Sequence, residues 1–281
     1  MRRGLILAIC LVGVLGCAGV VSQMEGSLHV PRRLRSSDGE AVGIAARDGV
    51  SLRASWLVPA REFNHCVIVL HGIADSRASS VGFGAMFVES GYAVLAPDSR
   101  AHGESGGSLV TYGLLERYDA LAWVGWMRAK GCTKIYGLGE SLGASVLLQA
   151  AAEEEVFSAI VAESPFADLQ DAAEARLIRS GASARFARFA ADTTRLYARL
   201  IHGMNLREAS PLRTFVQVKI PVLLIHGLDD DQTPAEHSRR LAAANPAFAT
   251  LWLVAGVKHQ SAYSREPIEW RRRVLSWFEE H

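Results

Sequence analysis

A serine flanked by glycines, in Gly139-Glu140-Ser141-Leu142-Gly143, is the strongest chemical signal in the sequence. It lies between an expected strand over 134–138 and an expected helix over 141–152. The glycines would let the strand and the helix approach closely and leave the Ser141 hydroxyl exposed as a nucleophile. The backbone N–H of Leu142, unpaired at the positive end of the helix, could stabilise a developing oxyanion. The alternative interpretation is a serine that only caps a helix.

A serine alcohol needs a base to take its proton, and the usual base is a histidine oriented by a carboxylate. His259 meets this need best, because it lies between the last expected strand, 250–254, and the last expected helix, 267–280. That loop is at the carboxyl edge of the sheet, where Ser141 also emerges. His226 ends a strand and is expected to brace a turn. Five further histidines are less suitably placed: His29, His65, His202, His237 and His281.

The orienting carboxylate is expected in the loop after the strand over 221–225. This loop offers three adjacent aspartates, Asp229, Asp230 and Asp231. One of them could orient His259, while the others face solvent or cap a helix that starts near Pro234. Spacing alone does not choose among the three, and an acidic turn exposed to solvent is the alternative interpretation.

Strands and helices alternate along the chain, which predicts a mainly parallel sheet with helices on both faces. The first two strands flank the turn Arg47-Asp48-Gly49 and are expected to form a hairpin. The expected strands are 41–46, 52–58, 66–70, 92–96, 134–138, 159–162, 221–225 and 250–254. The segment 168–219, helical and without an obvious strand, separates the sixth strand from the seventh. We therefore predict one α/β domain with an eight-stranded sheet and a helical cap at 168–219.

Apolar stripes at spacings of three and four predict two of the helices. The helix over 114–130 is predicted from Leu115, Tyr118, Leu121, Ala122 and Trp126. The helix over 267–280 is predicted from Trp270, Val274, Trp277 and Phe278.

The N-terminus has the features of a targeting segment. Met1-Arg2-Arg3-Gly4 precedes an uncharged apolar run, so residues 1–21 are expected to be a signal peptide or a membrane anchor. Val14-Leu15-Gly16-Cys17 resembles a bacterial lipobox, although Leu15 departs from it, which adds a lipoprotein as a third alternative. With Arg2 and Arg3 kept cytoplasmic, the body would lie outside the inner membrane, on the periplasmic or cell-surface side. Residues 22–40 are expected to be a tether, and 41–281 the domain.

The composition excludes several classes of protein. The 281 residues are 49% hydrophobic and 21% charged, which is typical of a globular chain with a sizeable core and excludes disorder as the main state. A net charge of +1 gives no overall field to hold nucleic acid. No Cys/His spacing indicates a metal site, and no cofactor is expected.

Further motifs carry a resemblance to a known family. Leu70-His71-Gly72-Ile73 follows one expected strand, and Asp98-Ser99-Arg100-Ala101-His102-Gly103-Glu104-Ser105 follows the next. The second resembles Asp-x-Arg-Gly-His-Gly-x-Ser, with Ala101 where glycine is usual. The run from His226 to Asp230, followed by Pro234, resembles His-Gly-x-x-Asp-x-x-x-Pro. From residue 42 onwards the chain therefore resembles an α/β-hydrolase of the serine-hydrolase branch, which includes esterases, lysophospholipases, thioesterases and serine aminopeptidases.

This resemblance implies roles for single residues. It implies that Asp230 is the acid of a catalytic triad with Ser141 and His259, and that the N–H groups of Ile73 and Leu142 form the oxyanion hole. In this family the strands that carry Cys66 and Cys132 are neighbours, so a disulfide between them is allowed. Two free buried thiols remain the alternative.

The expected function is that of a serine hydrolase cleaving a carboxylic ester or related acyl bond through an acyl-enzyme intermediate. The expected partners are a small-molecule or lipid-like acyl substrate and, through the N-terminus, a membrane. A peptidase or amidase with the same triad is one alternative, and a non-catalytic binding protein on the same fold is another. The sequence leaves the acyl group, the leaving group and the oligomeric state open.

In the predicted cap, arginines alternate with large apolar residues along the sequence. This pattern has two interpretations. Its surface could face anionic lipid headgroups, or its helices could turn an apolar face to the site and a solvated face outward. The arginines are Arg176, Arg179, Arg185, Arg188, Arg195 and Arg199, and the apolar residues are Leu177, Phe186, Phe189, Leu196, Tyr197 and Leu200.

Overall fold

The computed structural model describes residues 26, 28–35 and 37–281 of the chain. The predicted leader, residues 1–21 with its lipobox, lies outside the described residues. None of the described helices is long and apolar enough to cross a bilayer.

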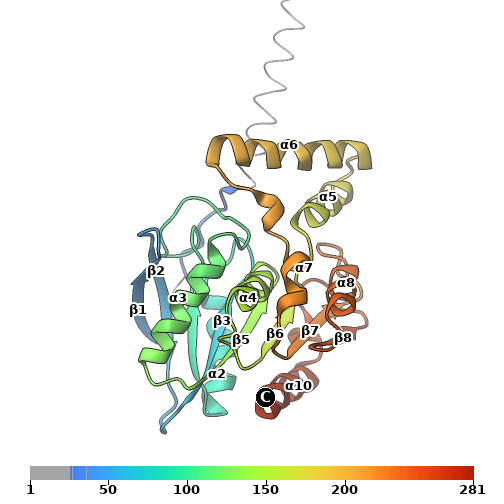
Figure 1. The fold of residues 1–281 in the computed structure, drawn as a ribbon. Coiled ribbons are helices and arrows are strands. Elements are labelled where there is room, and N and C mark those ends of the chain that lie inside the picture. Colours follow the sequence, from blue (N-terminus) through green and yellow to red (C-terminus); the bar gives the residue numbers. More distant parts are fainter. Residues whose placement is uncertain (1–25, 27, 36) are drawn as a thin grey trace, which may run out of the picture.

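An eight-stranded, mainly parallel sheet forms the centre of the domain, as predicted (Figure 1). Its spatial order is β1-β2-β4-β3-β5-β6-β7-β8, in which β2 runs antiparallel to both of its neighbours and every other neighbouring pair is parallel. The strands are β1 (Glu40–Ala45), β2 (Ser51–Leu57), β3 (His65–Leu70), β4 (Ala93–Pro97), β5 (Lys134–Glu140), β6 (Ile160–Glu163), β7 (Val222–Gly227) and β8 (Ala249–Val254). Because β3 to β8 are parallel, the loops that follow them meet at one edge of the sheet.

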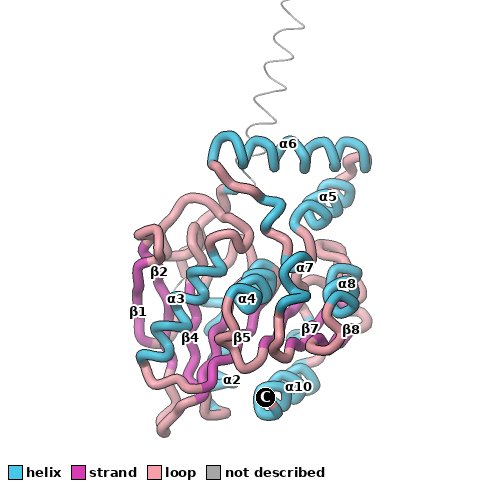
Figure 2. Tube along the Cα trace, viewed as in Figure 1, coloured by secondary structure: helices cyan, strands magenta, loops and turns pink. Residues whose placement is uncertain are grey.

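Helices cover both faces of the sheet (Figure 2), because side chains alternate between the faces along each strand. Val67 and Val69 of β3 enter the core layer under α2 (Arg77–Glu89) and α10 (Pro267–Glu280). Ile68 and Leu70 enter the opposite layer. That layer lies under α3 (Glu116–Ala129), α4 (Leu142–Glu153) and α8 (Glu236–Ala244), while α9 (Ala262–Arg265) is a single turn before α10.

The predicted cap is present between β6 and β7. It consists of α5 (Leu169–Arg179), α6 (Ala184–His202), η1 (Leu206–Glu208), α7 (Pro211–Thr214) and η2 (Phe215–Gln217). Asp168 caps α5 by accepting a hydrogen bond from the Gln170 N–H, and Ser183 caps α6 in the same way. Figure 1 shows α6 lying across the end of the molecule, beyond the sheet.

Two sequence-based expectations about helices need correction. Helix α2 was not anticipated, since its sequence has no clear apolar stripe. The α3 helix exists, but its fully buried apolar residues are Ala120, Trp123, Val124 and Met127, whereas Leu121 and Trp126 of the predicted stripe are only partly buried beside the core. A buried ion pair lies on this inward face, with Arg100 Nε 2.6 Å from Asp119 Oδ2.

The described part of the predicted tether lies against the domain. Leu28 is fully buried, and its carbonyl accepts a hydrogen bond of 2.8 Å from the Val110 N–H. Arg32 donates to the carbonyl of Gly103, and the Ser37 hydroxyl lies 2.8 Å from that of Ser55. Leu28, Arg32 and Ser37 thus contact the domain within the described part of the predicted tether.

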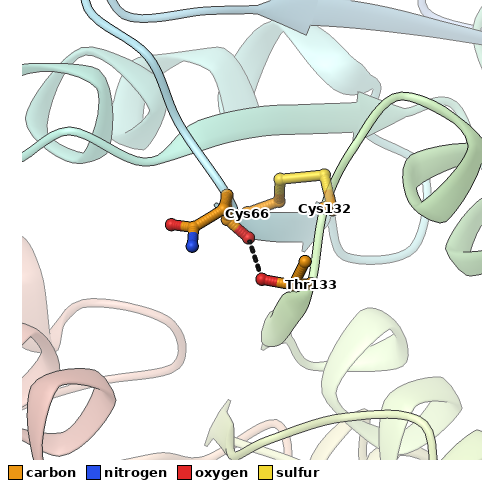
Figure 3. The surroundings of a disulfide bond; sticks show 4 residues. Cys66, Cys132 and Thr133 are labelled. Atoms are coloured by element: carbon orange, nitrogen blue, oxygen red, sulfur yellow. Dashed lines mark hydrogen bonds between the residues drawn. A yellow bond between two sulfur atoms is a disulfide. The ribbon is translucent and has the colours of Figure 1, made fainter.

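Cys66 and Cys132 form a disulfide, the first of the two alternatives left by the sequence (Figure 3). Their Cα atoms are 5.8 Å apart, in the range that a disulfide requires. Cys66 lies in β3 and Cys132 just before β5, and these strands pair in parallel with His65 opposite Lys134. Next to the disulfide, the Thr133 hydroxyl donates a hydrogen bond of 3.3 Å to the Asn64 carbonyl. The bridge therefore ties two central strands together at their amino ends.

Candidate active site

Three side chains from distant parts of the sequence form one hydrogen-bonded row. The Nδ1 atom of His259 lies 2.7 Å from Oδ2 of Asp230. On the other side of the imidazole, Nε2 lies 2.9 Å from Oγ of Ser141. The row fixes the tautomer, with Nδ1–H donating to the carboxylate and Nε2 accepting from the serine hydroxyl. The structure thus brings together the three residues that the sequence analysis selected as a triad.

Ser141 occupies a tight turn between β5 and α4. Its φ is 50° and its ψ is −107°, a backbone conformation that residues other than glycine rarely adopt. The glycines on either side make room for this turn. A Cβ on Gly139 would lie 2.5 Å from the Ala144 nitrogen, and one on Gly143 would lie 2.2 Å from the Leu70 carbonyl oxygen. The spacing of these glycines therefore has a steric cause, and it leaves the hydroxyl at the carboxyl edge of the sheet.

Asp230 is the aspartate, among the three candidates, that contacts His259. It is buried, whereas Asp229 and Asp231 are exposed. Its second oxygen, Oδ1, accepts hydrogen bonds from the N–H groups of Gln232 and Thr233. Burial by itself would raise the pKa of Asp230, but the hydrogen bonds from His226 and His259 outweigh it and hold that pKa well below its usual range. Asp230 is therefore a carboxylate at neutral pH.

His226 braces the turn that presents Asp230, as the sequence analysis expected. Its Nε2 lies 2.7 Å from the Thr233 carbonyl oxygen and 3.2 Å from Oδ2 of Asp230. Its Nδ1 lies 2.7 Å from the Ser238 hydroxyl at the start of α8. The ring thus connects the end of β7, the acidic loop and the following helix, and keeps the carboxylate in place.

Ile73 lies in the loop after β3, and Leu142 begins α4 just after the paired strand β5. In the register of β3 and β5, Leu70 lies opposite Gly139, so each proposed oxyanion donor comes three residues after a register partner. Within the described part of the chain, neither of the two N–H groups donates to a protein atom. Leu142 is the first residue of α4, where an unpaired N–H is expected to attract negative charge.

Two buried histidines support the loop that carries Ile73, a role the sequence analysis did not assign. The Nε2 atom of His102 accepts a hydrogen bond of 3.1 Å from the Ala74 N–H, and Nε2 of His71 accepts one of 3.1 Å from the Ser99 N–H. Burial lowers the pKa of both rings, that of His71 to about 4, so both are neutral acceptors at pH 7. Their place in the two family-like motifs was the available signal.

Two carboxyl groups lie at adjacent strand ends beside the serine. Glu140 directly precedes Ser141, and it lies opposite Glu163 in the register of β5 and β6. Glu163 is fully buried and accepts hydrogen bonds of 2.9 Å from the Ala262 N–H and the Trp270 indole N–H. It therefore holds the segment that follows His259. Burial raises the pKa of Glu140 to about 8, and the neighbouring Glu163 and Asp75 carboxyls act in the same direction.

This arrangement has the parts that nucleophilic attack on a carbonyl requires. A hydroxyl, a base in the right tautomer, an orienting carboxylate and two free N–H groups lie at one edge of the sheet. Among the described residues, no group of three His, Cys, Asp or Glu side chains is placed to hold a metal ion.

Comparisons with known proteins point to one family. The sequence pattern of the prolyl oligopeptidase family matches residues 78–281. The protein YqkD of Bacillus subtilis is 29% identical over 224 residues, which are 76% of this chain and 70% of that protein. The human protein ABHD12B is 30% identical over 193 residues, 64% of this chain and half of that protein.

The solved structures include an esterase, Pf2001 of Pyrococcus furiosus. It superposes with a TM-score of 0.73 at 25% identity, over 90% of this chain and 99% of the esterase. A puromycin-hydrolysing peptidase of Mycobacterium tuberculosis superposes with a TM-score of 0.69 at 21% identity, over 89% of this chain and 40% of that protein, which shows a shared fold.

Proposed function

Because the chain belongs to the prolyl oligopeptidase family of α/β-hydrolases, we propose that it is a serine hydrolase that cleaves a carboxylic ester or related acyl bond. The observation that carries this proposal is the row from Asp230 through His259 to Ser141, with hydrogen bonds of 2.7 and 2.9 Å. One of the similar structures is an esterase, and the match covers nearly the whole length of that esterase. This similarity supports an ester as the substrate.

The proposed reaction begins when Ser141 Oγ attacks the substrate carbonyl carbon while His259 Nε2 takes the hydroxyl proton. Asp230 accepts the hydrogen bond from Nδ1–H and stabilises the imidazolium that forms. The N–H groups of Ile73 and Leu142 bind the negatively charged carbonyl oxygen of the tetrahedral intermediate. His259 then gives its proton to the leaving oxygen, the carbon–oxygen bond breaks, and the acyl group remains on Ser141. Water, deprotonated by His259, releases the acid and restores the serine.

A peptidase or amidase activity is the second candidate, because the matching family takes its name from an oligopeptidase. The same triad would cleave a C–N bond if His259 protonated a leaving amine. Rates on an ester and an anilide with the same acyl group would separate the two candidates. A serine triad usually cleaves esters faster than anilides. A ratio of ester to anilide rate well above that usual preference would support the ester proposal, whereas efficient cleavage of the anilide would support the peptidase.

A fluorophosphonate probe, which reacts with activated serines, tests the proposal directly. Wild-type protein should be labelled, and Ser141→Ala should lose both labelling and ester hydrolysis, the latter by on the order of 10⁶ in kcat. Ser264→Ala, at an exposed serine of α9, is the matched control and should be labelled like wild type. Labelling of the Ser141→Ala protein at the wild-type level would refute the assignment.

We also propose that the protein is exported and held at a membrane through its N-terminus. The disulfide between Cys66 and Cys132 supports an oxidising compartment, where such bonds persist. The basic start and the apolar run over residues 5–21 support a signal or anchor. The mass of the mature N-terminus from cells would distinguish a lipidated Cys17, a retained anchor and a cleaved signal. An unmodified protein found with reduced cysteines in the cytoplasm would contradict the proposal.

A further inference from the structure

Helix α6 exposes a stripe of large apolar side chains. Phe186, Phe189, Leu196 and Leu200 follow one another at spacings of three, seven and four, so they share one side of the helix, together with the adjacent Ile201. Their exposed fractions are 54% for Phe186, 62% for Phe189, 56% for Leu196, 71% for Leu200 and 62% for Ile201. A different side of α6, made of the small residues Ala187, Ala191 and Ala198, is buried, where α6 packs on α5 and η1. Among the described residues, these side chains belong to none of the core clusters, and an exposed apolar surface of this kind is typical of an interaction site.

The polar side of α6 is basic. It carries Arg185, Arg188, Arg195 and Arg199 against a single acidic residue, Asp192. Arg195 pairs with Asp192 at 2.8 Å, whereas Arg185, Arg188 and Arg199 form no ion pair with any described carboxylate. Arg188 also lines a cavity of about 390 Å³ together with Arg207 and Arg213, and the carboxylates Asp168 and Asp192 line the same cavity. A helix with an exposed apolar stripe beside a row of basic side chains complements an anionic lipid surface.

The chain enters the domain next to α6. Leu28 is fully buried and packs in one small cluster with Ala198 of α6 and Leu206 of η1. The sequence just before it contains the uncharged apolar run over residues 5–21. A membrane segment in that run would hold α6 close to the bilayer, because Leu28, the first buried residue in the described part of the chain, packs against α6.

We propose that α6 is an interfacial helix, which lies on an anionic bilayer with Phe186, Phe189, Leu196, Leu200 and Ile201 among the acyl chains. The arginines beside the stripe then contact the lipid phosphates. The cap that contains α6 follows β6 at the edge of the sheet where Ser141 follows β5. If the proposed function holds, on which this last step rests, the site takes its acyl substrate from the membrane surface rather than from bulk water.

Tryptophan fluorescence on the full chain tests the position of α6. Phe189→Trp places a reporter on the stripe, and Ile268→Trp is the matched control, because Ile268 is 86% exposed on α10. Figure 1 shows α10 at the end of the molecule away from α6. Each variant is reconstituted into vesicles of phosphatidylcholine and phosphatidylglycerol in equal parts, with or without bromine on the acyl chains. The signal of the added tryptophan is the difference from wild type, which has six.

The proposal predicts that brominated chains quench the added fluorescence of Phe189→Trp at least about twofold more than that of Ile268→Trp. Adding Arg185→Glu and Arg199→Glu to Phe189→Trp should reduce this quenching, since both charges are reversed. Equal quenching of the two reporters would overturn the proposal. So would a blue-shifted but unquenched Phe189→Trp in a protein that crosslinks as a dimer, since the stripe would then contact a second copy. Quenching needs no turnover, so an inactive protein would refute the proposed function and leave this test intact.

Discussion

The Oδ2 atom of Asp230 lies 2.7 Å from Nδ1 of His259, although 29 residues separate them in the sequence. The same oxygen lies 3.2 Å from Nε2 of His226, so one carboxylate oxygen is shared by two imidazole rings. One ring faces the serine, and the other anchors the loop. The contact thus joins the proposed chemistry to the turn that supports it.

The first prediction concerns this carboxylate. Asp230→Asn should lower kcat/KM for an aryl ester by about 10⁴, because an amide cannot stabilise the imidazolium and favours the wrong tautomer. Asp229→Asn is the control, since Asp229 is exposed and should retain near wild-type kinetics. Steady-state rates, with thermal unfolding of each variant alongside, make the measurement. If the Asp230→Asn protein is folded and has the kcat/KM of the wild type, Asp230 does not orient the base.

The second prediction concerns pH and Glu140, whose pKa is raised to about 8 by burial and by neighbouring carboxyls. The folded state holds the Glu140 proton more tightly than the unfolded chain. The contribution of this group to the free energy of unfolding is therefore greatest below pH 4.5 and declines as the pH rises towards 8. Glu140→Gln removes the charge and should raise the free energy of unfolding by about 1–3 kcal/mol at pH 8. At pH 4 the gain should be near zero.

Urea unfolding of wild type and Glu140→Gln at both pH values makes this measurement. A gain of equal size at pH 4 and pH 8 would mean that it arises from packing rather than from the ionisation of Glu140.

The third prediction concerns the disulfide. Replacing both Cys66 and Cys132 by alanine should lower the free energy of unfolding by about 2–5 kcal/mol, because the bridge closes a long loop in the unfolded chain. Reduction of the wild-type protein with dithiothreitol should give a similar loss, and the double variant should not respond to it. If dithiothreitol destabilised both proteins equally, its effect would lie elsewhere in the chain.

The fourth prediction compares two glycines. Gly143→Ala would place a methyl group 2.2 Å from the Leu70 carbonyl oxygen, so α4 or β3 must shift, and about 1–3 kcal/mol or more of stability should be lost. Gly125→Ala, inside α3 with no atom within 4 Å of the new Cβ, should instead gain about 0.5–1 kcal/mol. Thermal unfolding of the two variants tests the sign of each change, and a neutral Gly143→Ala would contradict the close approach of α4 to β3.

Much of the fold could be predicted from the sequence because its signals are local. The β-branched runs at 66–70 and 221–225 became β3 and β7, and the insertion over 168–219 became the cap. The start of α10 at Pro267 followed from the preference of proline for the first turn. The inward face of α3 could not be predicted from an apolar stripe, since it also carries the charged Asp119, whose ion-pair partner Arg100 lies in a loop elsewhere in the chain.

The sequence by itself determined the candidate nucleophile, the candidate base and a choice of three acids. The spacing of the glycines and the order of the strands are local features that can be identified without the fold. Only the tertiary structure decided that Asp230 faces His259 while Asp229 and Asp231 face solvent, that His71 and His102 support the loop of Ile73, and that α6 turns its apolar stripe outward. Spacing along a chain records which residues can share a turn or a face. Which of them meet depends on register, burial and ion pairs between segments that the chain brings together only when it folds.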